Sequence, residues 1–120
     1  MNFISIGAFL SALSVVLGAF GAHGIKNSVE PVLFETYQTA SHYLFIHSMA
    51  ILFYGLFCKL MNKTTGIWPG KLFLLGMVLF SGSLYLIVFT GIKAFGMITP
   101  LGGLSFIIAW IGFGLHAKQL

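Results

Sequence analysis

Long apolar segments alternate with short polar ones along this chain. Residues 2–22, 36–58, 72–92 and 98–117 contain no lysine, arginine, aspartate or glutamate. An α-helix rises 1.5 Å per residue, so about 20 residues cross a hydrocarbon core of about 30 Å. The alternation typical of barrel strands is missing, and helices are then the only structure that satisfies the backbone inside a bilayer. The pattern predicts an all-α integral membrane bundle of four transmembrane helices over these ranges, in one domain covering residues 1–120.

The third connection between the predicted helices is very short. It consists of residues 91–96, which forces the third and fourth helices into a tight antiparallel hairpin. Thr99 and Pro100 follow it. A hydroxyl residue followed by proline is typical of a helix start, so we expect Thr99 to be the N-cap of the last helix.

The composition excludes an ordinary soluble domain. Hydrophobic residues make up 58% of the chain and charged residues only 7%, whereas about a quarter of the residues in soluble domains are charged. A small domain has too little interior to bury so much apolar surface. The net charge of +4 comes from dispersed lysines. We therefore expect membrane lipids as partners, with contacts to anionic headgroups, and no nucleic acid.

The lysines also predict the orientation in the membrane. Four spans place both termini and the middle loop on one side, which carries Lys59, Lys63, Lys71 and Lys118, and leave Lys26 and Lys93 on the other. Lysine is enriched in cytoplasmic loops. The count predicts that both termini are cytoplasmic.

Small residues recur at helical spacing in the first and last segments. They are Gly7, Ser11, Ser14, Gly18 and Gly21 in the first, and Gly102, Ser105, Ala109 and Gly112 in the last. Such residues let helix backbones approach closely where lipid supplies no hydrophobic drive for association. We interpret both sets as helix-packing surfaces, and a homo-oligomer is one arrangement they allow.

Polar residues interrupt the second apolar segment and the end of the first. The candidate ligand-binding set is His23, Glu35, Thr39, His42, Tyr43 and His47, with Gln38 on the same half of the helix. Polar side chains inside a membrane are energetically expensive and normally turn inward towards partners or water. A convergence of His23, Glu35 and His42 is sterically reasonable. His23 could equally be a helix-end residue that bonds a terminal carbonyl or water.

Four ordered motifs resemble those of a known family. They are GAFGAHG (18–24), YQTASHYLFIH (37–47), LFSGSLYL (79–86) and GMITPLGGLSFIIAW (96–110). Together they resemble the bacterial domain-of-unknown-function family numbered 423, whose eukaryotic relatives are the transmembrane protein 256 family. The resemblance implies a small four-helix protein of the bacterial inner (plasma) membrane, without an established reaction or ligand. The family often has tryptophan or arginine near the start of the second motif, where this chain has Phe34 and Glu35.

Three classes of function are compatible with these features. The best fit is a non-enzymatic protein that self-associates or binds a lipid or small ligand, with no catalytic residue, metal or cofactor. A small transporter or channel that uses the polar face of the second helix comes next. A haem- or metal-dependent enzyme is third, because His42 and His47 lie about 140° apart around the helix and cannot readily grip one ion. Cys58 is the only cysteine, which indicates neither a disulfide nor a thiolate site.

The predicted orientation can be tested by cysteine labelling. In a Cys58→Ser background, Asn27→Cys should react with an impermeant thiol reagent added to intact cells, and Asn62→Cys should react only after lysis, because the lysine count places position 62 inside. Labelling of position 62 alone in intact cells would reverse the orientation.

Overall fold

Four antiparallel helical stretches make up the structure. The computed structural model describes residues 2–120, and in that range it contains no strand. The elements are α1 (Phe3–Phe20), the π-helical η1 (Gly21–Ile25), α2 (Pro31–Leu60), α3 (Trp68–Gly76), the π-helical η2 (Met77–Ser81), α4 (Gly82–Thr90), the 3-10 turn η3 (Lys93–Met97) and α5 (Thr99–Ala117). Four continuous stretches are long and apolar enough to cross a membrane: Phe3–Ile25, Pro31–Leu60, Trp68–Thr90 and Lys93–Ala117. The predicted all-α architecture with four spans is confirmed.

Two helices begin earlier than the uncharged segments predicted. α2 begins at Pro31 rather than at residue 36, and the third stretch begins at Trp68 rather than at residue 72. Both have proline in the first turn, where its missing amide has no partner to lose. The added residues include Glu35 and Lys71, whose exposed charged side chains suit the headgroup region of a bilayer. The limits of the uncharged segments therefore do not mark the helix ends.

The prediction that Thr99 caps the last helix is wrong. The preceding residue, Ile98, already has helical backbone angles, with φ −82° and ψ −30°, because η3 leads directly into α5. The Thr99 hydroxyl instead lies 2.5 Å from the hydroxyl of Ser83 in α4. This contact joins the two arms of the hairpin close to their connection.

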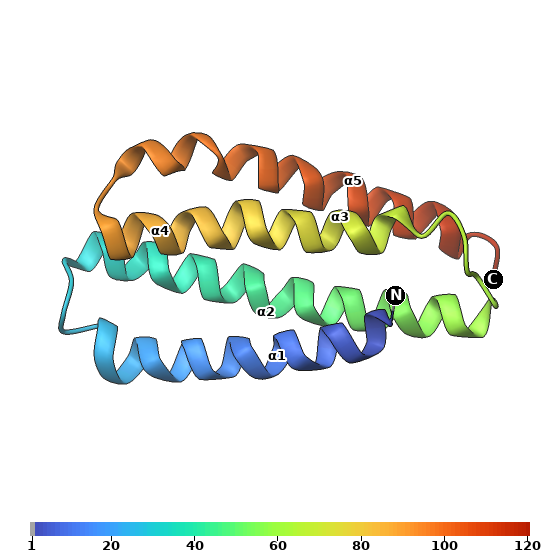
Figure 1. Ribbon diagram of the computed structural model, residues 1–120, viewed down its shortest axis with the longest axis horizontal. Coiled ribbons are helices and arrows are strands. Elements are labelled where there is room, and N and C mark those ends of the chain that lie inside the picture. Colours follow the sequence, from blue (N-terminus) through green and yellow to red (C-terminus); the bar gives the residue numbers. More distant parts are fainter. Residues whose placement is uncertain (1) are drawn as a thin grey trace.

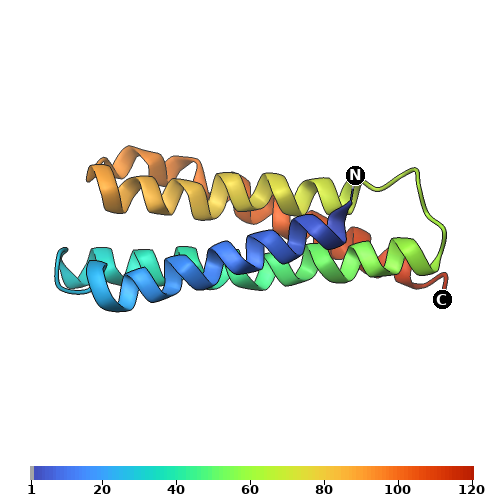
Figure 2. The same ribbon diagram turned by 60° about the horizontal axis from the view of Figure 1, so that its bottom comes forward.

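α2 lies in the middle of the arrangement (Figure 1). α1 packs along α2, the α3–α4 stretch packs on another side of α2, and α5 packs mainly against α3 and η2. Figure 2 shows that α1 crosses α2 at an angle. Between α1 and α5, one face of α2 stays uncovered, where Gln38, His42 and Ile46 are exposed.

The closest helix contacts depend on glycine. A Cβ atom on Gly7 of α1 would lie 2.7 Å from the backbone nitrogen of Leu52, and one on Gly55 of α2 would lie 2.7 Å from that of Ile4. At the other contact, a side chain on Gly102 of α5 would overlap the backbone of η2 at Phe80. The remaining small residues that are buried in α1, η1 and α5 are Ser14, Gly21, Ser105, Ala109 and Gly112, and Ser11 is half-buried with its hydroxyl 2.8 Å from the Gly7 carbonyl.

Gly18 does not pack against a helix, contrary to the prediction. It is exposed, and apart from the adjacent turns of α1 itself no atom lies within 4 Å of the place where its Cβ would be. The helices approach most closely near Gly7 and lie farther apart towards the other end of α1 (Figure 1), where the Tyr37 ring lies against Gly21 and fills the gap. Helical spacing places Gly18 on the correct side of α1 but does not reveal where along α1 the crossing lies.

The same substitution, glycine to leucine, distinguishes the packed position Gly7 from the unpacked position Gly18. Gly7→Leu should lower the free energy of unfolding by about 1–3 kcal/mol or more, because the side chain would force the α1 and α2 backbones apart. Gly18→Leu should change it by less than about 0.5 kcal/mol, because its side chain enters open space. Denaturant unfolding in detergent micelles would measure both. Equal losses would mean that α1 packs in a different register.

Candidate functional site

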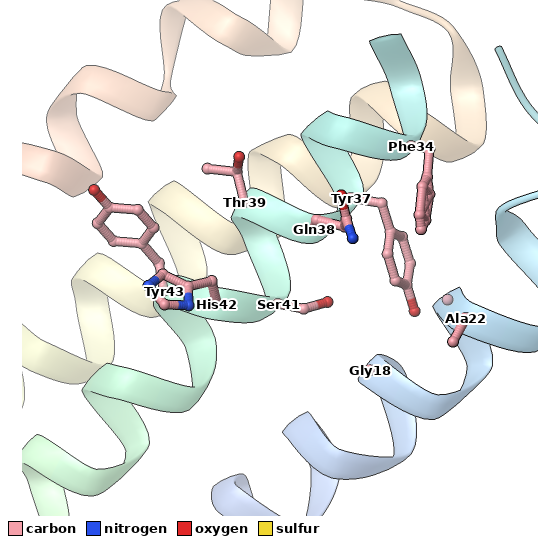
Figure 3. A pocket seen from close by; sticks show the side chains of 10 residues that line it. Gly18, Ala22, Phe34, Tyr37, Gln38, Thr39, Ser41, His42 and Tyr43 are labelled. Carbon is pink, nitrogen blue, oxygen red and sulfur yellow. The ribbon is translucent and has the colours of Figure 1, made fainter. Parts of the chain in front are cut away.

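A groove opens between the end of α1 with η1 and the first half of α2 (Figure 3). We call it the lateral groove, and its volume is about 500 Å³. Its lining combines aromatic rings, small residues and polar side chains: Gly18, Gly21, Ala22, Phe34, Tyr37, Gln38, Thr39, Ser41, His42 and Tyr43. The groove is therefore polar along α2 and apolar where it meets α1.

Tyr37 forms the back wall of the lateral groove. Its side chain is 1% exposed, and it points from α2 to α1 (Figure 3), where its hydroxyl donates a hydrogen bond to the Leu17 carbonyl. A side chain on Gly21 would overlap the Tyr37 ring. Gly21 thus leaves space for the Tyr37 ring, and this ring keeps α1 and α2 far enough apart for the lateral groove to lie between them.

A second contact fixes this wall to α4. The Ser41 hydroxyl lies 2.6 Å from the Tyr85 hydroxyl, and the rings of Tyr37 and Tyr85 meet edge to face with centroids 5.2 Å apart. Tyr37, Ser41 and Tyr85 were absent from the predicted site. The motif YQTASHYLFIH contains the first two, but only the fold shows that they meet the tyrosine of the third helical stretch.

The polar residues of α2 mostly face outward, contrary to the expectation that they turn inward. Glu35, Thr39 and His42 are exposed, whereas the ring of Tyr43, which is 38% exposed, packs against Phe80 with centroids 4.6 Å apart. Thr39 satisfies its hydroxyl within the helix by donating to the Glu35 carbonyl at 3.1 Å. The inward rule fails here because neither α1 nor α5 covers this face of α2.

His23 does not join the predicted cluster. It lies in η1 and is exposed, and the lateral groove lining does not include it. Glu35 lines a neighbouring hollow of about 540 Å³ at the surface end of the groove, together with Lys26. Of the three residues predicted to converge, only His42 lines the lateral groove.

His47 is the one histidine of α2 that is buried, at 3% exposed. Its Nδ1 lies 2.8 Å from the Tyr43 carbonyl, and its Nε2 lies 3.1 Å from the indole nitrogen of Trp110 in α5. A carbonyl only accepts and an indole only donates. Nδ1 therefore carries the proton, Nε2 accepts from Trp110, and the ring is neutral.

The His47 ring is also stacked on Phe106 of α5, with centroids 3.5 Å apart and an interplanar angle of 11°. Both ring nitrogens are engaged by the protein. Within residues 2–120, no group of three or more His, Cys, Asp or Glu side chains is placed to hold a metal ion. The arrangement of His47 is that of a structural link between α2 and α5.

Comparison with known proteins places the chain in a family. The family model described as "Protein of unknown function (DUF423)" matches residues 17–103. This chain belongs to that family. The UPF0382 membrane protein YwdK of Bacillus subtilis (strain 168) is 43% identical over 113 residues, which are 91% of this chain and 89% of that protein. The UPF0382 membrane protein SAB0533 of Staphylococcus aureus (strain bovine RF122 / ET3-1) is 41% identical over 112 residues, 91% of this chain and 88% of that protein.

The DUF423 match includes the lateral groove and His47 but ends before Trp110. No solved structure matches the chain. The relatives are bacterial membrane proteins, and the four spans make this DUF423 member a multi-pass membrane protein. The names of its relatives assign no reaction and no ligand.

The link between His47 and Trp110 should be measurable as a coupling. Trp110→Phe leaves Nε2 without its donor, and we expect a loss of about 1–3 kcal/mol in the free energy of unfolding. The double variant His47→Phe/Trp110→Phe should lose about 0.5–3 kcal/mol less free energy of unfolding than the sum of the two single variants, because each side chain is the hydrogen-bond partner of the other. Unfolding in detergent micelles provides the measurement, and strict additivity would show that the bond contributes nothing.

Proposed function

We propose that this chain is a non-enzymatic membrane protein that binds an amphipathic small molecule, taken laterally from the bilayer, in the lateral groove. Both termini face the cytoplasm, and no cofactor takes part. The observation that carries the proposal is the exposure of Gln38 and His42 on α2 at a depth where lipid tails offer no hydrogen bonds.

The depth follows from the length of α2. Its 30 residues span about 45 Å at 1.5 Å per residue, so each end of a centred helix extends about 7 Å beyond a hydrocarbon core of about 30 Å. By the same rise, Gln38 lies just inside the core and His42 about 9 Å inside it. Polar groups at that depth are expensive unless a partner satisfies them.

The lining of the lateral groove indicates the chemistry of the partner. The rings of Phe34 and Tyr37 suit an apolar body, whereas the amide of Gln38 and the imidazole of His42 can each donate a hydrogen bond. An amphipathic molecule supplies both surfaces. The groove opens sideways between α1 and α2, so such a molecule can enter from the lipid without crossing water.

Self-association is the competing way to satisfy these groups. A second copy could place its own polar side chains against Gln38 and His42, since interhelical hydrogen bonds contribute to helix association in membranes. The groove favours the small molecule because a hollow of about 500 Å³ lies within the range of small-molecule sites and would be left unfilled by a helix lying across it.

Gly18→Leu tests the proposal by filling the groove. The position is surrounded by open space, so the fold should tolerate the change while the bulky side chain displaces the ligand. Native mass spectrometry of protein extracted in mild detergent should detect a bound small molecule on the parent chain and at least a fivefold lower occupancy on the variant. Gly114→Leu is the matched control, since its side chain also enters open space and lies outside the groove.

Equal occupancy in both variants, or a parent chain without any bound molecule, would contradict the proposal. If the parent protein is a dimer and the His42→Leu variant is a monomer, the result would support a second copy of the chain as the occupant instead. Size-exclusion chromatography with light scattering distinguishes that outcome.

A further inference from the structure

The lateral groove adjoins one further hollow at each of its ends, and we call the three together the depression along α2. At its surface end it shares Ala22, Phe34 and Gln38 with the hollow that contains Lys26 and Glu35, which we call the outer hollow. At its other end it shares His42 and Tyr43 with a hollow of about 380 Å³ that reaches Trp110. We call the latter the deep hollow.

One face of α2 forms the floor of all three parts. Glu35, Gln38, His42 and Ile46 follow one another at steps of three or four residues and are all exposed, which places them in one line on the helix. The line is about 17 Å long at 1.5 Å per residue. It leads from the membrane surface to the middle of the bilayer, the path that an acyl chain follows.

The polarity of the depression falls with depth. The outer hollow carries charged groups of opposite sign, Lys26 on the α1 side and Glu35 on α2. The lateral groove carries uncharged hydrogen-bonding groups, and the deep hollow is mostly apolar, with Ile107 and Trp110 on its α5 side. A phospholipid has the same order: charged headgroup, ester groups, hydrocarbon.

Resting on the proposed function, we propose that the occupant is an amine-bearing phospholipid with one acyl chain in the depression. Its phosphate lies beside Lys26 and its ammonium beside Glu35, so each charge meets its opposite. Gln38 and His42 donate to ester oxygens, and the acyl chain passes over Ile46 and alongside Trp110. A lipid with a phosphate but no amine would leave Glu35 without its partner, which makes the headgroup selective.

The fluorescence of Trp110 can show whether an acyl chain occupies the deep hollow. Trp110 is 43% exposed in the deep hollow, and the chain has two tryptophans, so Trp68→Phe leaves Trp110 as the single fluorophore. Lysophosphatidylethanolamine brominated near the middle of its acyl chain is titrated into delipidated Trp68→Phe protein in detergent. We expect saturable quenching, because heavy atoms that bind in the deep hollow contact the indole.

The deep hollow can be closed without touching the rest of the depression. The Cβ of a residue at position 103 would make only ordinary contact with Phe80, at 3.9 Å, so Gly103→Leu should fold and project into the space of the acyl chain. It should abolish the quenching. Gly82→Leu is the matched control, since its position is surrounded by open space in another hollow, and it should quench like the parent.

Headgroup selectivity is tested with lipids that carry the same brominated acyl chain and a different headgroup. Brominated lysophosphatidylglycerol and a brominated fatty acid should bind about two- to fivefold more weakly than lysophosphatidylethanolamine, the range expected for losing one partly exposed charge pair. Glu35→Gln should remove the preference for the amine. Equal affinities of the three ligands for the parent would overturn the assigned headgroup.

The two proposals fail in different ways. Occupancy that depends on position 18, without quenching of Trp110, would leave the lateral groove as a ligand site and overturn the extended phospholipid. Linear, unsaturable quenching that Gly103→Leu does not reduce would also overturn it, because that is the behaviour of bulk detergent-dissolved lipid.

Discussion

The contact between α1 and α2 at Gly7 and Gly55 is the constraint on which the site depends. In lipid, helices associate through close packing and hydrogen bonds, because burial between helices removes no apolar surface from water. Each glycine lies against the other helix's backbone, which brings the two helices closest near the N-terminal end of α1. At the other end the Tyr37 ring holds the helices apart, with its hydroxyl on the Leu17 carbonyl. α1 and α2 are therefore in close contact near Gly7 and farther apart near Tyr37, and the lateral groove lies where they are farther apart.

Hydrogen bonds hold the other side of α2 in place. Ser81 in the π-helical turn η2 donates to the Ala40 carbonyl at 2.8 Å, and Trp110 donates to His47 at 3.1 Å. A π-helical turn widens the helix locally, and Gly102 of α5 packs directly on the backbone of this one. These contacts hold α2 to α5 and η2 on the side away from α1. The proposed ligand therefore does not need to assemble the uncovered face of α2.

The sequence predicts the four spans well because charge and hydropathy respond directly to the bilayer. It predicts the site less well because helical periodicity specifies a direction around one helix and not the identity of its neighbour. Gly7 and Gly18 lie on the same side of α1, yet only Gly7 meets α2. His42 and His47 are both polar positions of α2, yet one is exposed and the other is buried under Trp110. Tyr37 is part of the motif YQTASHYLFIH, but its role in separating α1 from α2 depends on a contact 20 residues away in the chain.

The exposed polar face of α2 differs from the polar groups that are satisfied within the fold. Polar groups that serve only the fold are satisfied inside it, as His47 is by the Tyr43 carbonyl and Trp110 and as Thr39 is by the carbonyl of Glu35. Gln38 and His42 face out of the bundle at a depth where leucine would be less costly. They lie in one line with Glu35, beside a glycine at position 18 that packs against nothing. A helix that required only stability would have apolar side chains at positions 38 and 42, so their chemistry supports the proposed binding of a molecule from outside the chain.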